Sequence, residues 1–187
     1  MELLKQICAK AKGSGRTIVL PEGQDPRVIK AANLALQENV ANIIVLGTPE
    51  EITFSENAAG MKLMPTAQVI DYTQGPLLDE LAEAFYEKRK AKGMTPEGAR
   101  QALLDKRIYF GAMMLATGKA DGLVAGSIAS TGDMLRAAFQ CVGTAPGIKL
   151  ASSTFLMGLR EPTAAGDDVL CFADCAVNPC PTAEQMV

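Results

Sequence analysis

Residues 16–47 read RTIVLPEGQDPRVIKAANLALQENVANIIVLG, and this stretch decides the expected class of fold. It begins with a short apolar run at 16–21, which a proline closes, and it ends with a second apolar run at 42–47. Between the two, apolar residues recur after Asp25-Pro26 at the spacing of a helix with a wide buried face. A strand, a helix and a strand within about 30 residues predict a βαβ unit, and strands that are apolar on both faces are typical of a parallel sheet covered by helices.

The rest of the chain continues this alternation of strand and helix patterns. Strand patterns lie at 67–71, 121–126, 149–157 and 169–174, and helix patterns lie at 76–90, 95–105, 107–117 and 131–142. Such alternation predicts a doubly wound α/β fold. We expect a first domain at 1–146, with three layers around a parallel sheet, and the beginning of a second α/β domain at 147–187. The expected junction is Thr144-Ala145-Pro146-Gly147.

The composition excludes several classes of function. The 187 residues include no histidine, which rules out Ser-His-Asp and Cys-His nucleophiles, His-ligated zinc and a histidine general base on this chain. A net charge of -3 argues against a nucleic-acid-binding surface, although a few local arginines can still hold an anionic ligand. The apolar runs are far shorter than the roughly 20 residues that span a bilayer, and no signal peptide opens the chain. We therefore expect a cytoplasmic protein without membrane or nucleic-acid partners.

The cysteines do not form a recognisable framework. There are five of them: Cys8, Cys141, Cys171, Cys175 and Cys180. The spacing of the last three could suggest a metal, but a closed zinc site needs four ligands and neither a second cysteine pair nor a histidine is present. We expect thiols that lie in the core or line a cleft, and no metal site.

The strongest candidate for a binding site is the segment GSIASTGDMLR at 126–136. A predicted strand ends at Gly126, and a loop with Ser127, Ser130 and Thr131 leads into a predicted helix. Backbone N–H groups and hydroxyls at the positive end of a helix dipole bind anions, and open α/β sheets bind ligands at the carboxyl ends of their strands. These residues are therefore candidates for contacts with an anionic substrate.

A simpler interpretation of the same segment is an ordinary helix start. In that case a cap is followed by an exposed ion pair between Asp133 and Arg136, worth only about 0.2–0.5 kcal/mol. One face of the predicted helix is apolar and carries Met134, Leu135, Ala138, Cys141 and Val142. Arg136 lies on the other face. The residues alone do not decide between the cap and the anion site.

Arg89 is a second candidate, with an equally simple alternative. It lies at the end of the helix pattern 76–90, on the flank of the apolar stripe and among lysines. Cations in a last helical turn interact favourably with the negative end of the helix dipole, and Gly93 is placed to stop the helix. Taken alone, these residues favour the simple capping role.

The end of the chain carries a helix-start signature. Thr182 and Gln185 have the spacing of a capping box, but only two residues follow. Because a helix of one turn is unstable, we expect the natural polypeptide to continue.

Five segments form an ordered set of motifs: RTIVLPE at 16–22, EAFYEKRKAKG at 83–93, ADGLVAG at 120–126, STGDMLR at 130–136 and FADCAVNP at 172–179. In this order and spacing they closely resemble the phosphate acetyl/butyryltransferase family. The resemblance extends over essentially the whole chain.

The resemblance implies a fold, a reaction and an assembly. The fold is similar to that of isocitrate and isopropylmalate dehydrogenases, and the reaction is acetyl-CoA + phosphate ⇌ CoA + acetyl phosphate. Family members are homodimers with CoA as a substrate and without a tightly bound cofactor. Two motif arginines assist CoA binding in the family, and they match Arg89 and Arg136. The resemblance thus favours the binding role at both positions.

The family's catalytic Ser-Arg pair and its Asp base would lie beyond residue 187, so the resemblance identifies no catalytic residue on this chain. It implies an N-terminal piece, inactive alone, that lacks the segment closing the first domain. Ala129 and Ala137 depart from the family pattern and leave the acyl preference open. A butyryl-transferring member, a relative fused to malic enzyme and a non-catalytic domain that binds acyl metabolites remain alternatives.

Overall fold

The computed structural model describes residues 2–148, 150–175, 177–178 and 181–183. They form two compact units, Lys12–Gly143 and a second unit from Met1–Ala11 and Thr144–Val187. The grouping places the N-terminal residues with the later part of the chain, whereas the sequence analysis assigned them to the first domain. The domain boundaries 1–146 and 147–187 stay a prediction.

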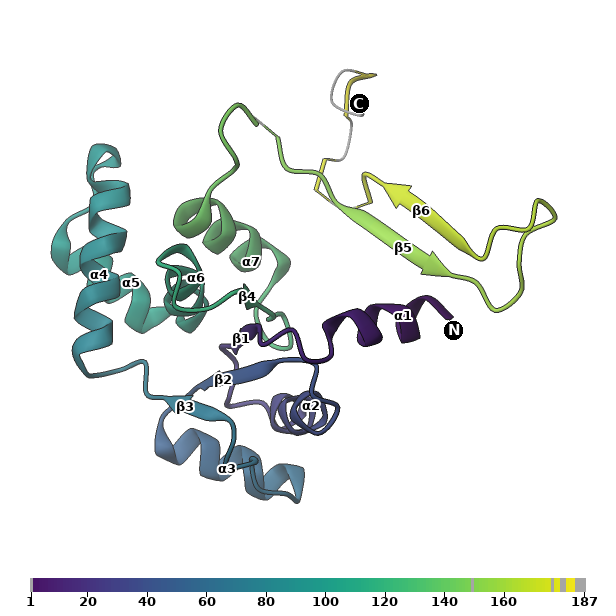
Figure 1. The fold of residues 1–187 in the computed structure, drawn as a ribbon. Coiled ribbons are helices and arrows are strands. Elements are labelled where there is room, and N and C mark those ends of the chain that lie inside the picture. Colours follow the sequence, from purple (N-terminus) through teal and green to yellow (C-terminus); the bar gives the residue numbers. More distant parts are fainter. Residues whose placement is uncertain (1, 149, 176, 179–180, 184–187) are drawn as a thin grey trace. The chain divides into compact units, whose positions relative to one another are not determined.

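The first unit is built on a four-stranded parallel sheet (Figure 1). Its strands are β1 (Thr17–Leu20), β2 (Asn42–Leu46), β3 (Gln68–Ile70) and β4 (Gly122–Leu123), in the order β3-β2-β1-β4. Val19 of β1 pairs with Ile44 of β2 on one side and with Leu123 of β4 on the other. The βαβ unit expected at 16–47 is confirmed, with α2 (Pro26–Gln37) as its helix.

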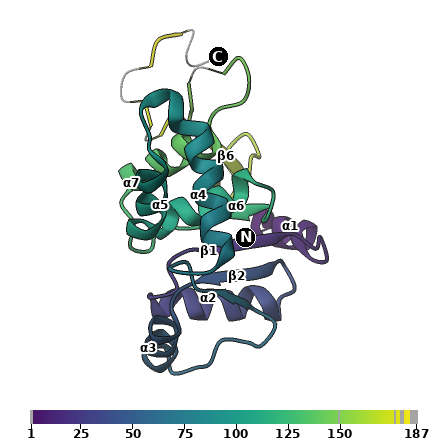
Figure 2. The ribbon, with the colours of Figure 1, turned by 90° about the vertical axis from the view of Figure 1, so that its left-hand side faces the viewer.

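Helices cover both faces of this sheet (Figures 1 and 2). One face packs on α2 and α3 (Pro49–Ala59), and the other on α4 (Pro76–Arg89), α5 (Pro96–Asp105), α6 (Arg107–Ala116) and α7 (Thr131–Ala137). Side chains of β2 alternate between the faces: Ile43 and Val45 join the α2–α3 core, and Ile44 and Leu46 join the larger core under α4–α6. The three-layer α/β arrangement predicted from the sequence is confirmed.

Some elements differ from the expectation. The sequence analysis assigned no element to 49–59, where α3 begins with a capping box between Thr48 and Glu51. The helix expected at 131–142 changes after α7 into a wider π-type turn, η2 (Ala138–Val142), and a 3-10 turn, η1 (Lys90–Lys92), follows α4. Of the predicted apolar face, Cys141 is buried but Ala138 and Val142 are exposed, and Ala137, outside that face, is buried instead.

The second unit contains α1 (Glu2–Ala11), β5 (Thr154–Gly158) and β6 (Val169–Ala173). The two strands pair antiparallel, with Phe155 opposite Phe172, so their direction differs from the all-parallel pattern of the first sheet. The strand expected at 149–157 begins five residues later than predicted. The capping box expected from Gln185 lies outside the described residues. No helix in the described part of the chain is long and apolar enough to cross a membrane.

Candidate functional site

The candidate site lies where β1 and β4 end side by side. The chain proceeds from β1 to β2 and β3 on one side of the sheet, and β4 lies on the other side of β1. This is the switch point of the strand order, where ligands bind in open α/β sheets, outside the carboxyl ends of the strands. The segment Pro21–Gln24 follows β1, and the loop 124–130 follows β4.

The loop after β4 surrounds the carboxylate of Glu22, a side chain of the protein itself. Both carboxylate oxygens of Glu22 accept hydrogen bonds from this loop. Oε1 accepts from the backbone N–H groups of Ile128 (2.9 Å) and Ala129 (2.7 Å). Oε2 accepts from the N–H groups of Gly126 (2.8 Å) and Ser127 (2.9 Å) and from the Ser127 hydroxyl (2.9 Å). The backbone conformation that allows this includes φ of 108° at Gly126, in the region that favours glycine.

Glu22 is only 3% exposed, and its charge is stabilised in that position. Burial alone raises the pKa of a carboxyl group, but the amide hydrogen bonds from Ala129, Ile128 and Ser127 outweigh burial and lower the pKa of Glu22. A neighbouring ion pair fixes the loop further. Arg27 pairs with Asp25 at 2.6 Å and donates to the carbonyl oxygen of Ser127 at 2.7 Å. Because Glu22 accepts their hydrogen bonds, the backbone N–H groups of Gly126 and Ser127 are not free to bind a ligand.

Ser130 and Thr131 stand at the start of α7. The Ser130 hydroxyl accepts from the backbone N–H of Asp133 at 3.1 Å and donates to the Asp133 carboxylate at 2.8 Å, so the predicted helix cap is confirmed. Thr131 is exposed. The ion pair expected between Asp133 and Arg136 is loose, at 4.0 Å, because Asp133 pairs more closely with Lys106 at 2.6 Å. Arg136 has 59% of its side chain exposed, and its Nε donates to the carbonyl oxygen of Gly132.

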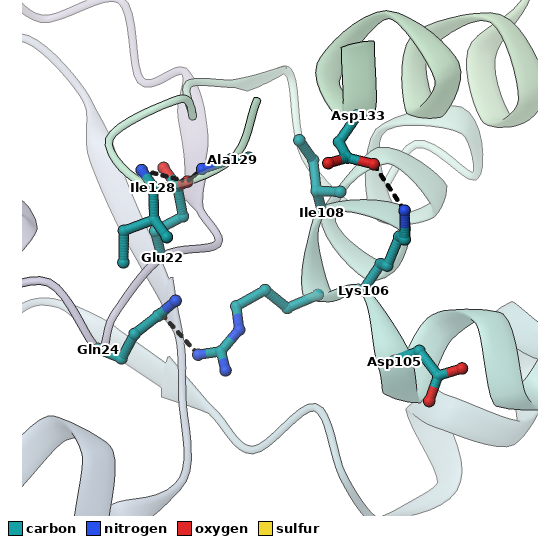
Figure 3. Close-up of a pocket in the computed structure, with 9 residues that line it drawn as sticks. Glu22, Gln24, Asp105, Lys106, Ile108, Ile128, Ala129 and Asp133 are labelled. Atoms are coloured by element: carbon teal, nitrogen blue, oxygen red, sulfur yellow. Dashed lines mark hydrogen bonds and ion pairs between the residues drawn. The ribbon is translucent and has the colours of Figure 1, made fainter. Parts of the chain in front are cut away.

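A cavity of about 260 Å³ adjoins the Glu22 loop (Figure 3). Ile128 and Ala129 line one side of it, and Lys106, Ile108 and Asp133 line the other. The cavity is lined by two cations, Lys106, which pairs with Asp133, and Arg107. Arg107 donates to Glu51 at 2.9 Å and to Gln24 at 2.6 Å. Its guanidinium lies 4.7 Å from the centre of the Tyr72 ring. Both cations of the cavity therefore have anionic partners within the chain.

Arg89 lies at the end of α4, half-buried. Its Nε is buried and has no hydrogen-bond partner among the described residues. Arg89 is close enough to Cys141 to act on its thiol: burial raises the pKa of Cys141 to about 12, and the charges of Lys88 and Arg89 oppose that rise. Because α4 packs against η2, which continues the helix of Arg136, the structure brings together the two elements that carry the predicted arginines.

Glu22, Lys106 and Arg107 were not among the candidate residues drawn from the sequence. The position of Glu22 just after Pro21, which closes the first apolar run, was the available signal, since it lies at the ligand-binding edge of the sheet. Among the described residues no group of three or more potential metal ligands gathers in one place. Cys171 is exposed and Cys175 is half-buried, and Cys180 lies outside the described residues.

Fold and site together define a doubly wound α/β protein whose switch-point loop holds a carboxylate and whose adjoining helices carry two predicted anion-binding arginines. Comparison with known families gives the particular assignment. The chain belongs to the phosphate acetyl/butaryl transferase family, whose model matches residues 2–187.

Individual relatives agree with this assignment. The chain is 46% identical to a phosphate acetyltransferase of Thermoanaerobacterium thermosaccharolyticum over 186 residues, which is 100% of this chain and 56% of the relative. A solved phosphotransacetylase from Streptococcus pyogenes has a TM-score of 0.86 at 37% identity, over 98% of this chain and 54% of that one. The EutD phosphotransacetylase from Staphylococcus aureus gives a TM-score of 0.83 at 34% identity, over 98% and 53%. The chain thus spans about half the length of these relatives.

Proposed function

We propose that the protein to which this chain belongs is a phosphate acetyltransferase, which moves an acetyl group between CoA and inorganic phosphate. The observation that carries the proposal is the buried Nε of Arg89, which has no hydrogen-bond partner in the described part of the chain and lies on a helix that packs against the continuation of the Arg136 helix. An unpaired buried donor costs about 1–3 kcal/mol, and a bound anion removes that cost. The names of the relatives supply the reaction class.

The arginines act in binding. CoA carries several phosphate groups, and a planar guanidinium can donate two parallel hydrogen bonds to one phosphate. Arg136 offers an exposed guanidinium for such a contact, and Arg89 offers its buried Nε, which no other described residue binds. Ser130 and Thr131 are proposed to bind the CoA phosphates together with the two arginines. Gly126 and Ser127 serve the site indirectly in this proposal, because their N–H groups hold Glu22.

The chemical step is an attack of the CoA thiolate on the carbonyl carbon of acetyl phosphate. The new C–S bond forms as the C–O bond of the anhydride breaks, and inorganic phosphate leaves with the electron pair of that bond; the thiol proton passes to a base. Cys141 is not a second nucleophile in this step, since its thiol is 0% exposed and burial raises its pKa to about 12. The base, and the Ser-Arg pair that assists it, are proposed to lie beyond residue 187, so that the 187 residues alone are inactive.

The proposal includes the remaining implications of the family. The enzyme is a cytoplasmic homodimer, uses CoA, acetyl-CoA, acetyl phosphate and phosphate, and needs no tightly bound cofactor. Acetyl is the proposed acyl group because the curated relatives at 46% and 39% identity both carry the name phosphate acetyltransferase.

Turnover with a panel of acyl donors tests the function. The protein as its gene encodes it would be assayed with phosphate and with acetyl-, propionyl- or butyryl-CoA, following the release of CoA. We expect the highest kcat/KM with acetyl-CoA and a stoichiometric yield of acetyl phosphate. A preference for butyryl-CoA would contradict the proposed acyl group, and CoA binding without turnover would favour a regulatory domain instead.

A further inference from the structure

The loop that was predicted to hold an external anion is filled from within the chain. Glu22 satisfies four backbone N–H groups and one hydroxyl of the loop 126–129, and it is 3% exposed. A phosphate group would meet occupied donors and a negative charge in the same place. The residues that follow the loop are then the ones left to hold an anionic substrate in the proposed function.

Glu22 itself is held firmly from the other side. The next residue, Gly23, donates its N–H to the carbonyl oxygen of Leu46 at the end of β2, at 3.1 Å. The approach is so close that a Cβ on Gly23 would lie 2.4 Å from that oxygen. The backbone that carries the Glu22 carboxylate is thus fixed on the central strands of the sheet.

The loop leads directly into the proposed binding residues. Ala129, the last donor to Glu22, is followed at once by Ser130, which caps the helix that carries Arg136. Hydrogen bonds therefore connect the end of β2, through Gly23 and Glu22, to the start of α7. Without the carboxylate, five donors of the loop lose their acceptor, and the contact of Arg27 with the carbonyl oxygen of Ser127 remains.

We propose that Glu22 is a positioning residue for CoA binding: it holds the loop 126–129 so that Ser130 and Arg136 stand in the geometry that receives a CoA phosphate. This inference rests on the proposed function, since it assigns CoA to Arg136. In this role Glu22 acts through the loop and takes no proton in the reaction.

The test compares Glu22→Gln with Glu22→Asp. Glutamine replaces one oxygen by an NH₂ group, which is a donor, so at least two loop donors lose their acceptor. Aspartate keeps the charge and both oxygens on a side chain one methylene shorter. Glu56→Gln is the matched control, because Glu56 also accepts from a backbone N–H, of Leu63, and from Lys62, but belongs to α3 outside the site.

The variants would be made in the protein as its gene encodes it, and each would be measured for the Kd of CoA by calorimetry, for KM and kcat, and for thermal unfolding. We expect Glu22→Gln to raise the Kd and KM of CoA by about 10-fold or more, with kcat changed by less than about 3-fold. Glu22→Asp should recover part of this loss, and Glu56→Gln should bind CoA like the unchanged protein.

A purely structural role gives a different pattern. It would reduce the fraction of folded enzyme and thus the apparent kcat, with the KM and Kd of CoA unchanged, and that result would overturn the proposal. If Glu22→Gln does not fold, Ser127→Ala is measured instead, because it removes one donor to Glu22. It should raise the Kd of CoA by a smaller factor, and an unchanged Kd would overturn the proposal.

Failure of the proposed function is seen separately. CoA binding without turnover in the unchanged protein overturns the transferase and still leaves the Kd comparison as the test of Glu22. If the unchanged protein does not bind CoA at all, both proposals are wrong.

Discussion

Ala129 donates its backbone N–H to Oε1 of Glu22 at 2.7 Å, although the two residues are 107 positions apart in the sequence. The bond joins the end of the first strand to the loop after the fourth strand, at the switch point of the sheet. It completes a set of contacts in which a buried carboxylate takes the place that a bound anion has in other helix-start loops. The geometry of the loop consequently depends on Glu22 being ionised, because the ionised carboxylate accepts these hydrogen bonds.

Glu22→Gln should flatten the dependence of stability on acid pH. The pKa of Glu22 is lowered in the folded chain, so its contribution to stability is complete above the ordinary pKa of a glutamate and is lost as the pH falls through the lower, folded value. One such group changes the free energy of unfolding by at most about 1.4 kcal/mol per pH unit. Urea unfolding between pH 3 and pH 7 measures the two slopes.

Other carboxyl groups with lowered pKa values, such as Asp25, Glu56 and Asp133, are present in both proteins, and so is Arg27, whose pKa the charge of Glu22 helps to raise. The difference between the two curves therefore isolates Glu22. Parallel curves would mean that the carboxylate is not stabilised in the folded state as described.

Gly23→Ala should destabilise the fold by about 1–3 kcal/mol or more, as overpacking does when the blocking atom cannot move. The new Cβ would meet the backbone oxygen of Leu46 at 2.4 Å, and relief requires the end of β1 to separate from β2. The measurement is chemical unfolding against Gly132→Ala, where the nearest atom is the flexible end of Arg136 at 3.1 Å. Equal unfolding midpoints for the two variants would contradict the close packing at Gly23.

Cys141 should resist alkylation while the chain is folded, because its thiol is buried and this burial raises its pKa to about 12. Cys8 is exposed and should react with iodoacetamide at pH 8 much faster than Cys141 in the folded protein. Peptide mass spectrometry separates the two sites, and unfolding in urea should make Cys141 reactive. Alkylation of both at the same rate in the native protein would show that the core under α4 and α6 is open.

The fold could be predicted from the sequence as far as local periodicity carries it. The strands at β1 and β2 and the helix between them have apolar patterns that depend on neighbouring residues only, and they were predicted correctly. Helix α3 was missed because few of its residues are buried, and Phe54 on it is 67% exposed. The capping box of Thr48 and Glu51 was its clearest signal.

The site was harder to predict than the fold. The loop at 126–131 could be identified as suited to an anion, since that property lies in a short segment. Which anion it holds depends on Glu22, more than 100 residues away, and no local pattern pairs the two. For the same reason the burial of the Arg89 Nε could not be predicted, because it depends on how α4 meets η2.

The affinity for CoA of Arg89→Ala and Arg136→Ala tests the central claim most directly, with Arg100→Ala, an exposed arginine paired with Asp79, as the control. Loss of a charge-assisted contact of about 1.5–3 kcal/mol predicts a rise in the KM for CoA of about 10-fold or more in each of the two variants. The KM for acetyl phosphate should change much less, and Arg100→Ala should match the unchanged protein. Small and equal changes of both KM values in Arg89→Ala and Arg136→Ala would contradict the account and return both arginines to the role of helix-end cations.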